Sequence, residues 1–266
     1  MLPSNLQPLV DGDVIRYEIG YGSETGWRAI TEDVEAIPPF RYVEELLLSR
    51  LEEIQTACQT DKRPVLYLTI GRTFRYDIAT RKGYKENRIE KKPWHFANLT
   101  AYMTHMLDAR IITEIEADDA MAMDHVSSNG TTILCSRDKD LKQVPGWFYS
   151  WELGRQGSFG PVEIDKAGYL ILSPDRKKLT GTGLSFFYSQ LLTGDTVDNI
   201  PGLPKTGPVN AFAMLNGKTP EEQLATVCEA YKGVYGETWE KELTEQGRLC
   251  WLLRNPDQVW EIGITD

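Results

Sequence analysis

The sequence predicts an α/β fold with a parallel sheet, and three observations lead to this prediction. Short apolar runs of strand length alternate with longer segments whose apolar residues recur at helical spacing. Acidic residues follow the apolar runs, where the strands should end. The chain has 266 residues, of which 41% are hydrophobic. This is enough for the core of one large domain, or of a domain with an appendage.

The first half of the chain contains the segments expected to form the sheet. Strands are expected at residues 6–10, 64–70, 110–115 and 131–135. Helices are expected between them, at residues 42–58, 94–107 and 116–126. A strand, a helix and a second strand in this order imply a right-handed parallel crossover.

The second half of the chain is expected to be mainly helical. Residues 146–178, rich in Gly, Trp and Tyr, are expected to form a β-hairpin or an irregular excursion. Further helices are expected at residues 186–192, 209–215, 220–231 and 239–253. We therefore expect an α/β core over residues 1–183 and a helical region over 184–266, packed together as one structural unit.

Eight acidic residues in four short clusters are candidate metal ligands. Three of the clusters fall just past the carboxyl ends of expected strands, where open parallel sheets bind their ligands. Crowded carboxylates repel one another, so a site filled by hard divalent cations explains them. The alternatives are ordinary turn residues for the third cluster and a helix N-terminus for the second. The eight are Asp11, then Glu116, Asp118 and Asp119, then Asp138 and Asp140, and last Asp195 and Asp198.

A turn rich in Gly and Pro at residues 200–208 follows the last acidic cluster. Such a turn can aim backbone N–H groups at a phosphate. Two Mg²⁺ or Mn²⁺ ions about 4 Å apart would stabilise the attacking and leaving oxygens of a phosphodiester, and one metal-bound water would be the nucleophile. The acids and the turn together predict a metal-dependent nuclease.

The distribution of charge supports a nucleic-acid partner, although the net charge is −10. Residues 62–92 contain ten Lys and Arg against three acids, a local balance of +7. Arg75, Lys85 and Arg88 are expected on one side of this stretch, with Lys85 and Arg88 on successive phosphate oxygens and the Tyr84 ring stacked on a base. The alternative is a solvated basic face.

Several classes of protein are disfavoured by what the sequence lacks. The four cysteines form no C-x-x-C pair, and the three histidines have no metal-site spacing. There is no glycine-rich nucleotide loop of the P-loop or dinucleotide type. No secretion signal and no run of about 18 apolar residues is found, so we expect a cytoplasmic protein.

With these residues in place, the chain resembles the structure-specific 5′ nucleases, the flap endonuclease superfamily. The likeness spans positions 9 to about 215 in the right order, and is greatest to the 5′→3′ exonucleases of short-tailed bacteriophages. The matching segments are residues 9–12, 74–75, 84–88, 116–119, 136–141 and 193–202, with a similar tail at 245–249.

The resemblance implies a PIN-like core with two Mg²⁺ or Mn²⁺ ions and a helical arch, within residues 71–107, built around Tyr84 to Arg88. It implies a helix-two-turn-helix at residues 195–215 that holds duplex DNA, with contacts from Gly202, Lys205 and Gly207 and a monovalent cation such as K⁺. By the same resemblance Lys85 and Arg88 steady the transition state. The first ion would be held by Asp11, Glu116, Asp118 and Asp138, and the second by Asp119, Asp140, Asp195 and Asp198.

The chain departs from the family pattern at two places. The family usually has an Asp shortly after the second strand, and residues 68–73 contain none. This implies weaker binding of the first ion and greater dependence on Mn²⁺, unless Asp13 or a water compensates. About two extra residues between Phe74-Arg75 and Tyr84-Lys85 imply a changed arch.

The sequence thus predicts a 5′→3′ exonuclease with flap endonuclease character. It would act on duplex DNA with a free 5′ end and on RNA–DNA primers, in the host cytoplasm if the chain is encoded by a phage. Two alternatives remain: a DNA-structure-binding protein of the same fold with weakened catalysis, and a PIN-type endoribonuclease.

Overall fold

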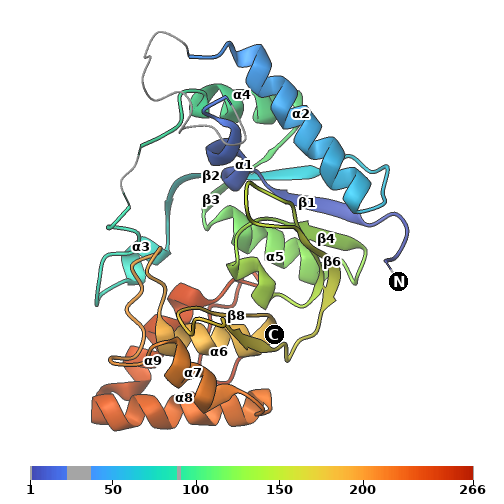
Figure 1. Cartoon of the computed structure of the whole chain (residues 1–266). Coiled ribbons are helices and arrows are strands. Elements are labelled where there is room, and N and C mark those ends of the chain that lie inside the picture. Colours follow the sequence, from blue (N-terminus) through green and yellow to red (C-terminus); the bar gives the residue numbers. More distant parts are fainter. Residues whose placement is uncertain (1, 23–36, 89–90, 266) are drawn as a thin grey trace. The chain divides into compact units, whose positions relative to one another are not determined.

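The computed structural model describes residues 2–22, 37–88 and 91–265, and its course is shown in Figure 1. The chain forms two compact units that are interleaved in sequence. The first unit comprises Met1–Gly71, Glu90–Asp138 and Gly146–Glu163, and the second Arg72–Ile89, Lys139–Pro145 and Ile164–Asp266. The units therefore do not divide at residue 183, and the expected packing as one structural unit stays a prediction.

The first unit is built on a six-stranded sheet with the order β3-β2-β1-β4-β5-β6. Its strands are β1 (Gln7–Asp11), β2 (Val65–Thr73), β3 (Arg110–Glu114), β4 (Thr132–Cys135), β5 (Gly146–Ser150) and β6 (Phe159–Ile164). β1 runs parallel to β2 and β4, with Val10 opposite both Leu66 and Cys135, and β4 runs parallel to β5. These three residues are buried, which explains why the central strands are continuous apolar runs. The predicted α/β fold with a mostly parallel sheet is confirmed.

Helices cover both faces of this sheet (Figure 1). On one face lie α1 (Gly12–Ile19), α2 (Phe40–Ala57) and α4 (Phe96–Met106), and on the other lies α5 (Ala117–Ser127). Val43, Leu47 and Ile54 share one side of α2 and are buried in the core. The helices expected at 42–58, 94–107 and 116–126 are therefore confirmed.

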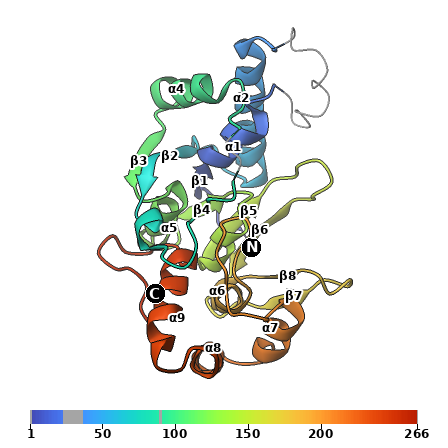
Figure 2. The same cartoon turned by 90° about the vertical axis from the view of Figure 1, so that its left-hand side faces the viewer.

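The second unit is mainly helical (Figure 2). Its longer helices are α6 (Gly183–Thr193), α7 (Pro208–Leu215), α8 (Pro220–Tyr235) and α9 (Trp239–Cys250). A β-hairpin of β7 (Leu170–Leu172) and β8 (Leu179–Gly181) and the short helices α3 (Arg75–Ile78), η2 (Asp140–Gln143) and η3 (Gly236–Thr238) complete it. α6 is almost wholly buried, and α8 begins with a capping box in which Thr219 accepts from the backbone N–H of Glu222.

The prediction of a helical arch around Tyr84 to Arg88 is wrong, because these residues form no helix. Between α3 and Arg88 the chain forms turns and no helix. Lys85 has a left-handed backbone (φ 57°), and its N–H donates to the carbonyl of Asp198 at 3.0 Å. A left-handed residue does not continue a right-handed helix, so the sequence forms a turn here.

Among the helices in the described residues, none combines the length and apolar composition that a membrane crossing requires.

Candidate metal and nucleic-acid site

Asp11 lies at the end of β1 and is 4% exposed. Its carboxylate caps α1 by accepting from the N–H of Val14 at 3.0 Å, and it accepts from the Ser136 hydroxyl at 2.7 Å. Burial, together with the neighbouring carboxylates of Asp13 and Asp138, raises the pKa of Asp11 to about 7, although the two hydrogen bonds act to lower it. An ionised carboxylate is therefore costly at this position, and a nearby cation would stabilise it.

Ser136 joins the ends of the two adjacent parallel strands β1 and β4. Its hydroxyl donates to Asp11 and accepts from the N–H of Asp138 at 2.8 Å. Asp11 and Asp138 thus lie close enough for the charge of one to raise the pKa of the other. The role of Ser136 was missed in the sequence, because a serine beside an acidic cluster gives no signal of which carboxylate it will contact.

Asp13 places a carboxylate against β2. Both of its oxygens accept from the N–H of Thr69 at 3.1 Å, and it forms an ion pair with Arg16. The Thr69 hydroxyl in turn accepts from the N–H of Ala117 at 2.8 Å, which ties β2 to the start of α5. Burial raises the pKa of Asp13 despite the Arg16 guanidinium. Asp13 therefore supplies an acid beside residues 68–73, the stretch in which the resemblance led us to expect an aspartate.

Glu116 and Asp119 form a capping box at the start of α5. The N–H of Glu116 donates to Asp119 at 3.1 Å, and the N–H of Asp119 donates to Asp118 at 2.8 Å. Asp119 is fully buried and Glu116 is 9% exposed. The alternative role of this cluster, as a helix N-terminus, is confirmed, and its role as a metal site stays a prediction.

In the second unit, Lys139 brings two predicted ligands together. Its ammonium lies 3.0 Å from Asp140 and forms a second ion pair with Asp195. Burial alone would raise the pKa of Asp195, but Lys139 and the backbone N–H groups of Val197 and Asp198 lower it overall. The sequence held a signal for this pairing, since Lys139 stands directly between Asp138 and Asp140.

Asp198 contacts the cationic segment, which we define as residues 80–88. Arg88 forms an ion pair with its carboxylate, and the ammonium of Lys85 lies 3.8 Å away. The hydroxyl of Tyr84 donates to the same carboxylate at 3.0 Å. Two of the predicted phosphate contacts, Lys85 and Arg88, are therefore brought together around one acid.

Two predicted contacts to DNA are wrong for a physical reason, which is burial. The Tyr84 ring is 2% exposed and packs edge-on against Tyr76, with ring centroids 5.3 Å apart, so it offers no face to a base. Arg75 is 1% exposed and donates to the carbonyls of Leu249 at 3.2 Å and Trp251 at 2.7 Å. Both residues support the second unit instead.

The turn that we call the Gly/Pro turn, residues 200–208, also differs from expectation at Gly202. Gly202 is buried, has a φ of 65° and donates its N–H to Gln246 at 3.2 Å, so this N–H is not aimed at a phosphate. A Cβ on Gly202 would lie 2.3 Å from the nitrogen of Gly194, which explains the glycine. Lys205 and Gly207 are exposed, and their contacts to DNA stay predictions.

The oxygen donors of the site fit hard divalent cations, and Asp11 supplies the physical reason for one to bind. In the part of the chain that the structure describes, no group of three or more His, Cys, Asp or Glu side chains has an arrangement that could hold a metal ion. The carboxylates instead have protein partners, such as the backbone of α5 for Glu116 and Lys139 for Asp195. The ligand set predicted from the sequence therefore stays a prediction.

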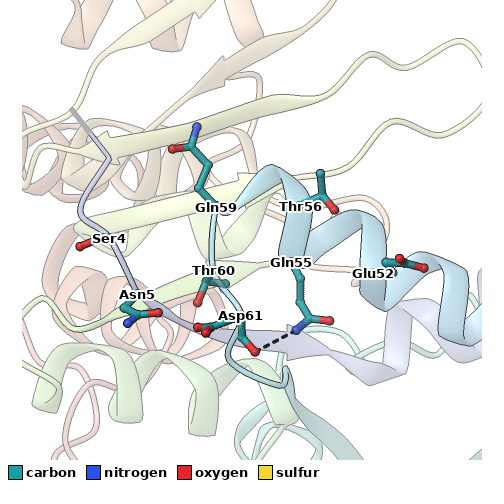
Figure 3. A pocket seen from close by; sticks show the side chains of 8 residues that line it. All are labelled: Ser4, Asn5, Glu52, Gln55, Thr56, Gln59, Thr60 and Asp61. Carbon is teal, nitrogen blue, oxygen red and sulfur yellow. Dashed lines mark hydrogen bonds between the residues drawn. The ribbon is translucent and has the colours of Figure 1, made fainter.

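An open polar hollow beside the end of α2 provides a contrast to this site (Figure 3). Gln55 donates to the backbone carbonyl of Asp61 at 3.5 Å, and the carboxylates of Glu52 and Asp61 are exposed. These acids suit control substitutions, because they lie outside the four acidic clusters. The lining residues are Ser4, Asn5, Glu52, Gln55, Thr56, Gln59, Thr60 and Asp61.

No protein-family model matches the chain, and no curated protein matches it in sequence. Among solved structures, it is similar to the bacteriophage T5 D15 flap endonuclease in a complex with DNA and metal ions, with a TM-score of 0.51 and 13% identity over 93% of this chain and 99% of the other. It is also similar to T5 D15 protein co-crystallised with metal ions, with a TM-score of 0.50 and 14% identity over 94% and 100% of the two chains. The chain has the PIN-like fold of the flap nucleases.

Proposed function

We propose that this chain is a metal-dependent 5′→3′ exonuclease with flap endonuclease activity. It hydrolyses phosphodiester bonds near free 5′ ends of duplex DNA and of RNA–DNA primers. The observation that carries the proposal is the buried Asp11, which lies beside Asp13 and Asp138 at the ends of parallel strands. The T5 D15 flap endonuclease, which has the same fold, is in complex with DNA and metal ions.

The proposed cofactors are two Mg²⁺ or Mn²⁺ ions. When bound, such ions stabilise charge on the attacking and leaving oxygens and lower the pKa of water. Asp13 would add negative charge near the first ion and so offset the missing acid in residues 68–73. The first ion is assigned to Asp11, Glu116, Asp118 and Asp138, and the second to Asp119, Asp140, Asp195 and Asp198.

The proposed contacts to the substrate come from the second unit. Lys85 and Arg88 would bind the scissile phosphate and stabilise its charge in the transition state. Lys205 and Gly207 would bind the duplex backbone, and a K⁺ ion would bind at the Gly/Pro turn. The proposed compartment is the cytoplasm, that of the host if a phage encodes the chain.

Cleavage of a 5′-labelled flap duplex tests the proposal. With Mg²⁺ we expect short labelled products, and with a chelator we expect none. Separate titrations of Mg²⁺ and Mn²⁺ test whether Asp13 offsets the missing acid, since a strong preference for Mn²⁺ would show that it does not. An intact substrate at micromolar enzyme with either ion would reject the proposed activity.

Substitution of Asp138 tests its assigned role. Because Asp138 would hold the first ion, Asp138→Ala should lower the cleavage rate at least about 100-fold while DNA binding in the presence of a chelator persists. Asp61→Ala removes an exposed carboxylate of the first unit and should cleave at the rate of the unsubstituted protein. Cleavage by Asp138→Ala at the control rate would contradict the role.

The two alternatives give different results in the same assays. A DNA-structure-binding protein would show salt-sensitive binding without nicking at any metal concentration. A PIN-type endoribonuclease would cleave an RNA hairpin in preference to the DNA hairpin of the same sequence.

A further inference from the structure

A single carboxylate of α9 holds the start of the cationic segment. Glu245 is 9% exposed, and its Oε1 accepts from the backbone N–H groups of Thr80 at 2.8 Å and Arg81 at 2.9 Å. Its Oε2 accepts from the Thr80 hydroxyl. All three donors at the start of the segment therefore depend on one buried side chain.

The next residue of α9, Gln246, contacts the cationic segment and the Gly/Pro turn with the same atom. It is 1% exposed, and its Oε1 accepts from the N–H of Gly202 at 3.2 Å and from Nη1 of Arg81 at 3.5 Å. Its Nε2 donates to the sulfur of Cys250 at 3.7 Å, which helps to fix the orientation of the amide. This one oxygen links two stretches of chain that lie far apart in sequence.

Arg81 strengthens the link between these stretches. Its Nη2 donates to the carbonyl of Gly202 at 3.4 Å and to the hydroxyl of Tyr235 at 2.6 Å, and its Nε lies 3.2 Å from Glu242. The Arg81 side chain is 19% exposed. Its guanidinium therefore has partners on α8, on α9 and on the Gly/Pro turn, which restrict its movement.

The far end of the cationic segment is attached to residues 195–199, which we call the acidic turn. Asn199 donates to the carbonyl of Gly83 at 2.8 Å, and Asn87 donates to the carbonyl of Thr196 at 2.7 Å. The segment is thus held at its start by α9 and further along by the acidic turn. The part between the attachments carries Lys85.

We propose that Glu245 and Gln246 are positioning residues that fix the spacing between the cationic segment and the Gly/Pro turn. The proposal rests on the proposed function, in which Lys85 and Arg88 bind the scissile phosphate while Lys205 and Gly207 bind the duplex. Because the distance between the cationic segment and the Gly/Pro turn is fixed, one substrate can contact both only if its reacting phosphate lies a set distance from a duplex. Duplexes with a 5′ end or flap meet this condition.

Two substitutions of Glu245 form a matched pair. Both backbone N–H groups donate to the same oxygen, Oε1, so Glu245→Gln keeps that acceptor and gains an amide that can donate to the Thr80 hydroxyl. Glu245→Ala leaves all three donors without this acceptor. We expect Glu245→Ala to lower kcat on a flap duplex roughly 10- to 100-fold and to raise KM, because contacts to phosphate are lost. Glu245→Gln should restore most of the lost kcat.

The salt dependence of DNA binding separates a positioning role from a merely structural one. Each phosphate contact contributes about 0.9 to the slope of log affinity against log salt. With a chelator present, Glu245→Ala should lower this slope by about 1 to 2, because Lys85 and Arg88 are no longer held in position to contact phosphates. Glu245→Gln should leave the slope unchanged. A Glu245→Ala protein with the kcat and slope of the unsubstituted enzyme would overturn the inference.

Hydrogen exchange of the unsubstituted protein tests the attachment even if Glu245→Ala does not fold. The amides of Thr80 and Arg81 should exchange more slowly than the same amides in a short peptide of residues 78–88. Exchange at the peptide's rate would refute the attachment.

If the unsubstituted protein cleaves no 5′-ended substrate, the proposed function fails and the inference with it. If it cleaves and Glu245→Ala cleaves equally well, the inference alone fails.

Discussion

The carboxylates of the two units differ in how their charge is compensated. In the first unit Asp11 is buried next to Asp13 and Asp138, and its pKa rises to about 7. In the second unit Asp195 is also buried, but Lys139 lies against it and its pKa is lowered. Both carboxylates follow strands or turns in the sequence and look alike there.

This difference shows that a predicted ligand can either cost stability or contribute to it before any metal binds. Asp11 is destabilised in the folded protein and gains most from a divalent cation. Asp195 already has a cation of the protein, so a metal would have to compete with Lys139. We therefore expect the effects of metal on stability to come mainly from the first unit.

The largest expected effect is on the pH dependence of stability with a chelator present. The folded pKa of Asp11, about 7, is above the unfolded value of 3.8. The folded state therefore binds the proton more tightly, and stability falls as pH rises from about 4 to about 7, by up to about 4 kcal/mol. Asp11→Asn keeps a capping side chain and should lack this fall.

Urea unfolding of both proteins at several pH values measures this effect. Asp11→Asn should be more stable than the unsubstituted protein at pH 7.5, with little difference at pH 4. Parallel curves for the two proteins across this range would show that Asp11 is not destabilised on folding.

A smaller effect of opposite sign is expected at Asp195. Its lowered pKa means that the carboxylate contributes stability above pH 3.8, which is lost as pH falls. Asp195→Asn should therefore lower the free energy of unfolding at pH 7.5, by about 1 kcal/mol because Lys139 is partly exposed. A stabilised Asp195→Asn protein would remove the contrast between the units.

The smallest effect is expected for Tyr84→Phe. The substitution removes the hydrogen bond to Asp198 and keeps the ring, so we expect a loss of about 0.5 kcal/mol in the free energy of unfolding. Because Asp198 also orients Lys85 and Arg88, we expect a roughly two- to fivefold lower cleavage rate. Thermal unfolding and single-turnover cleavage measure the two effects. If both the stability and the cleavage rate are unchanged, the hydrogen bond from Tyr84 does not position Asp198.

Local patterns were sufficient to predict much of the fold. The central strands are buried on both faces, so they are apolar runs, and their ends carry Asp11 and Asp138 as expected. Amphipathic spacing located α2, and the alternation of strands and helices indicated the parallel sheet. These features depend on neighbouring residues, which a sequence displays directly.

Other features depend on contacts between distant residues and could not be predicted in this way. Arg75 and Tyr84 were predicted to contact DNA from their residue types. Their burial could not be predicted, because it depends on Trp251 and Tyr76, which only the fold brings close to them. The turn at Lys85 replaced a predicted helix because the backbone of Asp198 accepts its N–H. Charge and residue type indicate what a side chain can do, but not whether it is exposed.

The attachment of Arg75 and Thr80 to α9 and the residue after it has a consequence for synthesis of the protein on the ribosome. Arg75 donates to the carbonyls of Leu249 and Trp251, more than 170 positions later in the chain. The N–H of Thr80 donates to the carboxylate of Glu245, 165 positions later. These loops close only after residues 245–251 have been synthesised, and closing such long loops is slow. A growing chain therefore carries this basic stretch without these partners until residues 245–251 have been made.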